Sequence, residues 1–238
     1  MLTFIFVQAR LGSTRFKDKV LKKINNLELI KYQYKRLQKV KYPKKIYFLI
    51  PKNKKNIPLK KFLEKNKIDY FTGSESNVLD RYYKAAKEYN SENIIRITAD
   101  CPLIDYRLVE KLIRLFKKHK PNYLSNTMLR TFPHGMDMEM FSFTTLEKTW
   151  QRAKLKHDKE HVTPYMINNK KLFKPKSFIN SKNQSNYRIT VDYKEDLEVI
   201  KRIINNFRPN IYFSSSKISN FLKNNSDIVK INEMHKIY

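Results

Sequence analysis

Leu2-Thr-Phe-Ile-Phe-Val7 is a short apolar run that predicts a buried strand, and Gln8-Ala-Arg-Leu-Gly-Ser-Thr-Arg-Phe-Lys-Asp-Lys19 follows it directly as a polar segment. The cationic and hydroxyl-bearing members of this segment are Arg10, Ser13, Thr14, Arg15 and Lys19. Backbone N–H groups and hydroxyls can cradle phosphate oxygens while Arg and Lys neutralise their charge. The stretch therefore predicts a polyphosphate site after the first strand. The alternative is an ordinary basic surface loop in a lysine-rich chain.

Glycine use supports the first interpretation. The chain has only 3 glycines in 238 residues, namely Gly12, Gly73 and Gly135, whereas glycine usually makes up about 7% of a protein. Each lies in a dense polar segment: ARLGSTR, FTGSESNVLDRY and FPHGMDMEMF. We therefore expect special backbone geometry or close approach of another group at these positions.

Apolar strand patterns alternate with helical patterns through the first half of the chain. After the basic loop, strands are predicted at 45–50, 69–72 and 93–99, and helices at 27–40, 59–65, 77–89 and 107–118. Such alternation is typical of an α/β fold with a mostly parallel sheet and helices on both faces.

The second half is less regular. Its predicted strands are 138–143, 173–179 and 187–191, and its predicted helices are 144–154, 160–168, 195–207 and 217–223. Trp150 falls on the apolar face of its helix and is expected in the core, and Cys101 is expected to be a small buried residue. No repeat or linker divides the chain, so one domain over 1–238 is the simplest interpretation, with a first half of about 1–125 and a second of about 126–238.

Composition bounds the remaining possibilities. Apolar residues make up 41% of the chain, enough for a core, and the net charge is +28. The lysines are spread along the whole chain, which favours biased composition over a dedicated nucleic-acid surface. A single cysteine excludes a disulfide framework. The apolar run at the start is shorter than a signal sequence, and no stretch approaches a membrane span. We expect a cytoplasmic protein.

Two predicted strands end in an aspartate. Asp100 closes Arg96-Ile-Thr-Ala-Asp100, and Asp192 closes Arg188-Ile-Thr-Val-Asp192. In open α/β sheets, ligands bind outside the carboxyl ends of the strands. Two carboxylates at that edge suit Mg²⁺, which prefers one or two carboxylates together with phosphate oxygens. A turn or cap aspartate is the alternative at each position.

These segments together resemble a known family. ARLGSTR..KVL, RITADCPLID, HGMDMEMF, EHVTPYM and RITVDYKEDL occur in the order found in cytidylyltransferases of sugar acids, of the spore coat polysaccharide biosynthesis protein F type. These are relatives of CMP-KDO synthetase and CMP-sialate synthetase. The resemblance covers about residues 3–207 and implies a nucleotide-diphospho-sugar-transferase fold (GT-A-like). It implies transfer of CMP from CTP to the anomeric hydroxyl of a sugar, with release of pyrophosphate.

The resemblance also implies roles for individual residues. The nucleotide would be bound by Ala9, Arg10, Leu11, Gly12, Ser13, Arg15, Lys19, Gly73, Asp80 and Arg81. The residues implied in catalysis are Arg10, Lys19 and Asp100, and those implied as Mg²⁺ ligands are Asp100 and Asp192. The acceptor sugar would face His134, Asp137, Glu139, Glu160 and His161.

The chain departs from the family pattern at two places. Arg-Leu-Pro-Gly-Lys becomes Arg15-Phe-Lys-Asp-Lys19, which places Asp18 near the phosphates, and Thr-Pro after the late aspartate becomes Tyr193-Lys194. The expected partners are CTP and a small sugar, an acidic one by the resemblance, for surface polysaccharide synthesis, with a homodimer implied by the resemblance alone. The alternatives are a nucleotidyltransferase that uses another nucleoside triphosphate or a sugar 1-phosphate, and a basic nucleic-acid-binding protein.

Overall fold

A seven-stranded sheet forms the centre of the molecule in the computed structural model, which describes residues 2–42 and 44–235. From edge to edge its strands are β5 (Tyr70–Gly73), β4 (Lys44–Pro51), β1 (Thr3–Gln8), β6 (Asn93–Thr98), β8 (Glu139–Ser142), β7 (Tyr123–Ser125) and β9 (Lys176–Ser177). Only β8 runs against the others, since it is antiparallel to both β6 and β7. The expected mostly parallel sheet is confirmed.

The register of the parallel strands determines at which edge of the sheet the polar segments emerge. Residues Thr3 to Gln8 pair in parallel with Lys44 to Leu49 on one side and with Asn93 to Thr98 on the other. The carboxyl ends of β1 and β6 therefore lie side by side, with Gln8 opposite Thr98. The polar segment after β1 and the turn that contains Asp100 leave the sheet at this shared edge.

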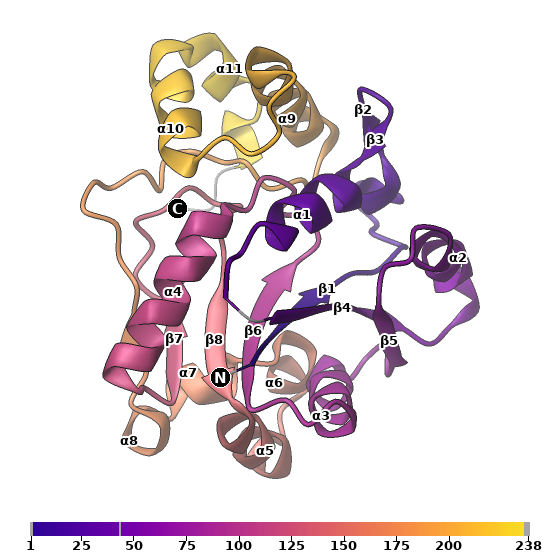
Figure 1. Cartoon of the computed structure of the whole chain (residues 1–238), viewed down its shortest axis with the longest axis vertical. Coiled ribbons are helices and arrows are strands. Elements are labelled where there is room, and N and C mark those ends of the chain that lie inside the picture. Colours follow the sequence, from indigo (N-terminus) through magenta and orange to yellow (C-terminus); the bar gives the residue numbers. More distant parts are fainter. Residues whose placement is uncertain (1, 43, 236–238) are drawn as a thin grey trace.

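Helices cover both faces of the sheet (Figure 1). One face packs against α1 (Leu29–Gln38), α2 (Ile57–Lys65), α4 (Tyr106–His119), α9 (Lys194–Phe207), α10 (Ser215–Asn224) and α11 (Ser226–Lys230). The other packs against α3 (Val78–Glu88), α5 (Phe143–Arg152), α7 (Pro164–Asn168) and α8 (Lys170–Phe173), with α6 (Lys156–His161) beside them. Strand β1 shows the alternation directly, because Ile5 and Val7 join the first core and Phe4 and Phe6 join the second.

Several predicted elements are corrected. The helix expected over 27–40 begins only at Leu29, because Leu27–Glu28 (β3) forms a small hairpin with Lys23–Ile24 (β2). The helix expected over 160–168 is two helices, α6 and α7, separated at Val162, whose φ is 73°. The strand expected over 173–179 is α8 followed by the short β9. The strand expected over 187–191 makes only one bridge, from His134 to Arg188.

In the described part of the chain, the buried cations are arginines. Arg36 is fully buried and donates to four backbone carbonyls, those of Leu103, Ile104, Ile211 and Phe213. It thereby holds the segment before α10 against the turn that follows Asp100. Arg81 and Arg188 are also buried, and no lysine in residues 2–42 and 44–235 is buried to the same degree.

Candidate active site

The segment between β1 and η1 (Lys19–Leu21) is fixed to the protein by its apolar members. Leu11 and Phe16 are buried, and the backbone N–H of Leu11 donates to Asn56 Oδ1 over 2.8 Å. Gly12 has a φ of 87°, as expected of a glycine-dependent turn. The buried side chain and the engaged N–H of Leu11 thus anchor the loop, whereas Arg10 and Arg15 are exposed on it, and a nucleotide contact by Leu11 stays a prediction.

Lys19 joins the two aspartates that end the RIT-x-Asp segments. Its ammonium lies 3.2 Å from Asp100 Oδ2 and 2.7 Å from Asp192 Oδ1. Burial lowers the pKa of Lys19, but the two carboxylates more than compensate, so its pKa is raised. The structure therefore brings together three residues that the sequence places far apart.

Asp192 is held as a carboxylate by surrounding cations. Besides Lys19, it accepts from Arg15 over 3.0 Å and from Arg188 over 3.1 Å. Burial alone would raise the pKa of Asp192, but Lys19, Arg15 and Arg188 outweigh it and lower the pKa. Asp100 instead accepts from the hydroxyl of Thr98, at 2.5 Å.

Asp196 fixes the backbone that carries Asp192, and the sequence prediction missed it. This fully buried carboxylate accepts from the N–H of Asp192 over 2.8 Å and from the N–H of Tyr193 over 3.0 Å. Arg188 donates to both of its oxygens over 2.8 Å. These bonds fix the start of α9 although Tyr193-Lys194 replaces the family's Thr-Pro. The sequence signal that could have identified Asp196 was its spacing of four residues from Asp192.

The donor set fits a hard divalent cation. Asp100 and Asp192 converge on one ammonium group, so the two carboxylates lie close enough to share one cation. Among the described residues no group of three or more His, Cys, Asp or Glu side chains could hold a metal ion. Mg²⁺ at these two carboxylates would therefore complete its coordination with phosphate oxygens and water, which is its usual preference.

The Gly73 loop lies at the same edge of the sheet, but two of its expected contacts are already engaged. Arg81 is buried and donates to the carbonyl of Ser74 over 2.9 Å. A Cβ on Gly73 would lie 2.8 Å from Arg81 Cγ, which explains the glycine. Asp80 accepts from Trp150 Nε1 over 3.0 Å and pairs with Lys84. Arg81 and Asp80 thus shape this loop, and a nucleotide contact by either stays a prediction.

Trp150 does not lie in the core. Its side chain is 37% exposed, and its ring stacks on Tyr83 with centroids 4.1 Å apart. The bond from its indole N–H to Asp80 requires a position at the surface, where the polar edge of the ring can reach the start of α3. Cys101 is buried, as expected.

Two of the residues expected near an acceptor, His134 and Asp137, form one polar cluster with Arg130 and Arg188. Arg130 donates to both oxygens of Asp137, at 2.5 and 3.2 Å, and His134 Nδ1 lies 3.1 Å from Arg188. Gly135 between them has a φ of 109°, and a Cβ there would lie 2.5 Å from the backbone of Ile189 and Thr190. Since Arg188 also contacts Asp192, the cluster adjoins the carboxylate pair.

Glu139 takes a different position from the one expected. It is buried, pairs with Arg96, and accepts from the hydroxyls of Tyr123 (2.5 Å) and Thr163 (2.7 Å). Burial and the adjacent carboxylate raise the pKa of Tyr123 well above its usual range, so its hydroxyl remains a donor. Val162, with its unusual φ, turns the chain so that Thr163 reaches this cluster. Glu139 thus holds Arg96, Tyr123 and Thr163 together inside the protein, and its contact with an acceptor sugar stays a prediction.

The remaining expected acceptor residues, Glu160 and His161, lie at the end of α6. The ring of His161 packs on that of His157 with centroids 4.6 Å apart. Partial burial and the nearby charges of His157, Arg96 and Arg10 lower the pKa of His161, against the opposing effect of Glu160. These residues therefore border the loop that follows β1, and their contact with an acceptor stays a prediction.

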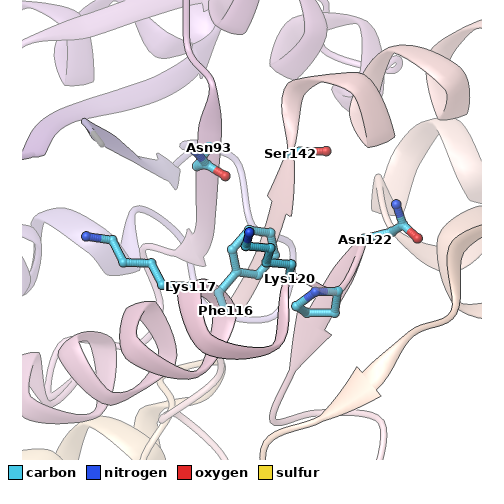
Figure 2. Close-up of a pocket in the computed structure, with 7 residues that line it drawn as sticks. Asn93, Phe116, Lys117, Lys120, Asn122 and Ser142 are labelled. Carbon is cyan, nitrogen blue, oxygen red and sulfur yellow. The ribbon is translucent and has the colours of Figure 1, made fainter.

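A hollow of about 140 Å³ joins these elements. The side chains around it come from the ends of β1 and β6, from the loop and from the late aspartate: Gln8, Ala9, Arg10, Ser13, Arg15, Lys19, Val20, Thr98, Ala99, Asp100 and Asp192. A larger hollow of about 560 Å³ lies at the opposite ends of the strands, between Asn93 and Ser142 on one side and Phe116, Lys117 and Lys120 at the end of α4 on the other (Figure 2). It contains none of the residues expected in the site. Convergent charged side chains, rather than volume, therefore mark the smaller hollow as the candidate site.

Comparison with known proteins agrees with this geometry. Residues 4–228 match the family model described as cytidylyltransferase. A solved cytidylyltransferase from Leptospira borgpetersenii is 32% identical, with a TM-score of 0.91 over 95% of this chain and 96% of that chain. The spore coat polysaccharide biosynthesis protein SpsF of Bacillus subtilis is 28% identical over 93% of this chain and 94% of its own length.

A more distant structure shares the fold. CMP:2-keto-3-deoxy-manno-octonic acid synthetase, solved in complex with CTP, is 14% identical, with a TM-score of 0.66 over 87% of this chain and 99% of that chain. The family match spans both aspartates, Lys19 and the loop after β1. The chain therefore belongs to the cytidylyltransferase family, and it is a nucleotidyltransferase.

Proposed function

We propose that the protein transfers CMP from CTP to a hydroxyl of a small sugar, with release of pyrophosphate. The observation that carries the proposal is the convergence of Lys19 on Asp100 and Asp192 beside a basic loop. The family name supports CTP as the donor, and the name of the SpsF relative supports a role in polysaccharide synthesis. The name of the sugar-acid synthetase neighbour supports an acidic sugar as the acceptor. We place the transfer of CMP at the anomeric hydroxyl of that sugar.

The reaction would need positioning and charge neutralisation more than covalent chemistry. The sugar oxygen attacks the α-phosphorus, the bond between that phosphorus and the β-phosphate oxygen breaks, and pyrophosphate leaves. Arg10, Arg15 and Lys19 would bind the β- and γ-phosphates and stabilise the leaving group. Mg²⁺ held by Asp100 and Asp192 would supply charge neutralisation at the phosphates.

The acceptor would lie between the Arg130, His134 and Asp137 cluster and the end of α6, with Glu160 and His161. The contact of Arg188 with both His134 and Asp192 supports this placement, because it joins the cluster to an aspartate proposed to hold Mg²⁺ beside the phosphates. The ion pair of Arg130 with Asp137 offers both a cation and hydrogen-bond acceptors for a polyhydroxylated acid. We propose a cytoplasmic location and a homodimer as the working form. No helix within the described ranges, 2–42 and 44–235, is long and apolar enough to cross a membrane.

Pyrophosphate release tests the proposal. CTP and Mg²⁺ would be incubated with a panel of 2-keto sugar acids and amino sugars, with Asp100→Ala as the control. Release that requires CTP, one sugar and Asp100 is the expected result. A thermal-shift panel of CTP, UTP, GTP and ATP would distinguish another nucleotide donor, and addition of sugar 1-phosphates would distinguish that acceptor class. Binding of nucleic acid with a steep salt dependence, without pyrophosphate release, would contradict the proposal.

A further inference from the structure

Gln8, the last residue of β1, lies between a buried ion pair and the hollow of the site. Gln8 is paired with Thr98, and Arg96 lies two residues before Thr98 on the same strand, so the three side chains point to the same face of the sheet. Glu139 is paired with Arg96 and points to that face as well. Arg96 NH2 donates to Gln8 Oε1 over 3.1 Å. Gln8 also lines the hollow together with Arg10, Lys19 and Asp100.

The guanidinium of Arg96 cannot turn freely. Glu139 pairs with its NH1 group and is itself held by the hydroxyls of Tyr123 and Thr163. The Glu139 side chain is 7% exposed and that of Arg96 is 14% exposed. A carboxylate with three donors in a nearly dry site holds its partner strongly, so Arg96 presents NH2 to Gln8 in a fixed direction.

This arrangement decides which end of the Gln8 amide faces the ligand. A guanidinium has only donors, and an amide has one acceptor oxygen and one NH2 donor. If the amide were reversed, two donors would face each other, so Oε1 must point to Arg96 and Nε2 must point away. Within the described residues, Nε2 of Gln8 has no hydrogen-bond partner in the protein.

We propose that Gln8 is a substrate-binding residue whose Nε2 donates to an oxygen of the bound nucleotide, and that Arg96 and Glu139 act as its positioning residues. The inference rests on the proposed use of CTP. The recipient is an oxygen of the phosphates, the ribose or the base, since each of these accepts a hydrogen bond. An amide polarised by a neighbouring guanidinium is a better donor than a free one.

Replacement of Gln8 by methionine tests the donor. Met has nearly the same size and no hydrogen-bonding amide, and Arg96 keeps its pair with Glu139. We expect Gln8→Met to weaken CTP binding about three- to tenfold, the range for loss of one neutral hydrogen bond. Gln38→Met, the same substitution on the exposed side of α1, should leave CTP affinity unchanged. Isothermal titration with CTP and with inorganic tripolyphosphate gives both affinities.

Replacement by glutamate tests the orientation. In Gln8→Glu one carboxylate oxygen accepts from Arg96, so the melting temperature should equal or exceed that of the parent. The other oxygen replaces the donor and faces the ligand oxygen, so CTP affinity should fall at least as far as in Gln8→Met. A role confined to folding predicts the same stability result in Gln8→Glu together with unchanged CTP affinity in Gln8→Met.

Each outcome decides a specific point. If Gln8→Met weakens CTP but not tripolyphosphate, the recipient oxygen belongs to the nucleoside; if it weakens both, the recipient is a phosphate. Unchanged CTP affinity in Gln8→Met overturns the inference. This holds even if Gln8→Glu weakens CTP binding, because the added negative charge alone can do so. A parent protein that does not bind CTP overturns the proposed function instead.

A double-mutant cycle tests the role of Arg96. Arg96→Lys keeps a cation beside Glu139 but removes the planar fork that orients the amide. It should weaken CTP binding when Gln8 is present and have little further effect in the Gln8→Met background. Losses that simply add in the double variant would show that Arg96 does not act through Gln8.

Discussion

The Nζ atom of Lys19 lies 2.7 Å from Oδ1 of Asp192, although 173 residues separate them in the chain. This contact joins the loop after the first strand to the segment before α9, and so closes the site across the sheet edge. It also balances charge, because the ammonium lies between two carboxylates that would otherwise repel each other.

Removal of Lys19 should disable catalysis. Lys19→Ala leaves Asp100 and Asp192 without their shared cation and removes a phosphate ligand. We expect turnover to fall by about 10²-fold or more, on the scale of losing one preorganised electrostatic contact. Steady-state pyrophosphate release measures this effect, with Lys22→Ala as the matched control, since Lys22 is exposed just after the loop. Parent-like turnover in Lys19→Ala would exclude a role in the reaction.

Removal of Mg²⁺ should abolish activity and leave the stability of the protein unchanged. Treatment with EDTA is expected to abolish pyrophosphate release, and Asp100→Ala should lower it at least about 10²-fold. The melting temperature of the ligand-free protein should not change with EDTA, because Lys19, together with Arg15 and Arg188 at Asp192, already offsets the charge of the two carboxylates. Differential scanning fluorimetry with and without Mg²⁺ checks this. Undiminished release in EDTA would contradict the metal assignment.

Gly135 should tolerate alanine far less than Gly12. Both have positive φ, but a Cβ at Gly135 would lie 2.5 Å from backbone atoms of residues 189 and 190, whereas at Gly12 the nearest atom is Lys55 Cδ at 4.0 Å. We expect Gly135→Ala to cost more than about 3 kcal/mol of unfolding free energy and Gly12→Ala about 1–2 kcal/mol. Urea denaturation of both variants measures the two costs, and equal costs would contradict the assigned contact.

His134 should make stability depend on pH. Burial lowers its pKa, and Arg130 and Arg188 act in the same direction, whereas Asp137 and Asp100 oppose them without compensating. The unfolded chain therefore takes up a proton at this residue first as pH falls. The stability that His134 contributes is complete above its ordinary pKa of 6.5 and declines as pH falls below that value.

Thermal denaturation between pH 5 and pH 8 checks the sign. His134→Gln should lose part of the fall in melting temperature below about pH 6.5, while His119→Gln, at the exposed end of α4, should follow the parent. A steeper fall in His134→Gln than in the parent would contradict the direction of the shift.

Sequence patterns predicted the parts of the fold that depend on local periodicity. The strands ending near Gln8 and Thr98 were clear because they are short segments rich in β-branched and aromatic residues, and the polar residues after them identified the edge that carries the site. The segment 187–191 was predicted as a strand from the same pattern, yet its N–H groups bond to loop carbonyls, those of His134 and Asp100. Periodicity reports burial and extension, and it cannot report which backbone an extended segment will pair with.

The supporting residues could not be predicted for a similar reason. Arg36 is important because it donates to four carbonyls from two segments that are distant in the sequence. No pattern in the residues near Arg36 predicts that these two segments pack around it. Glu139 was recognised as part of a polar motif, but its burial depends on Tyr123 and Thr163, which come from other elements. The family resemblance identified the right segments and could not say which of their side chains face inward.

The confinement of buried cations to arginine separates two roles of positive charge in this protein. The chain contains 38 Lys and 12 Arg, and the interior positions belong to Arg36, Arg81 and Arg188. Amine-directed chemistry would therefore act almost entirely on the exterior. Acetylation, which removes charge, and reductive methylation, which keeps it, would give a matched pair of preparations with the same interior. Comparing how fast CTP associates with each would measure what lysine charge contributes to attraction, the charge of the partly buried Lys19 in the site included.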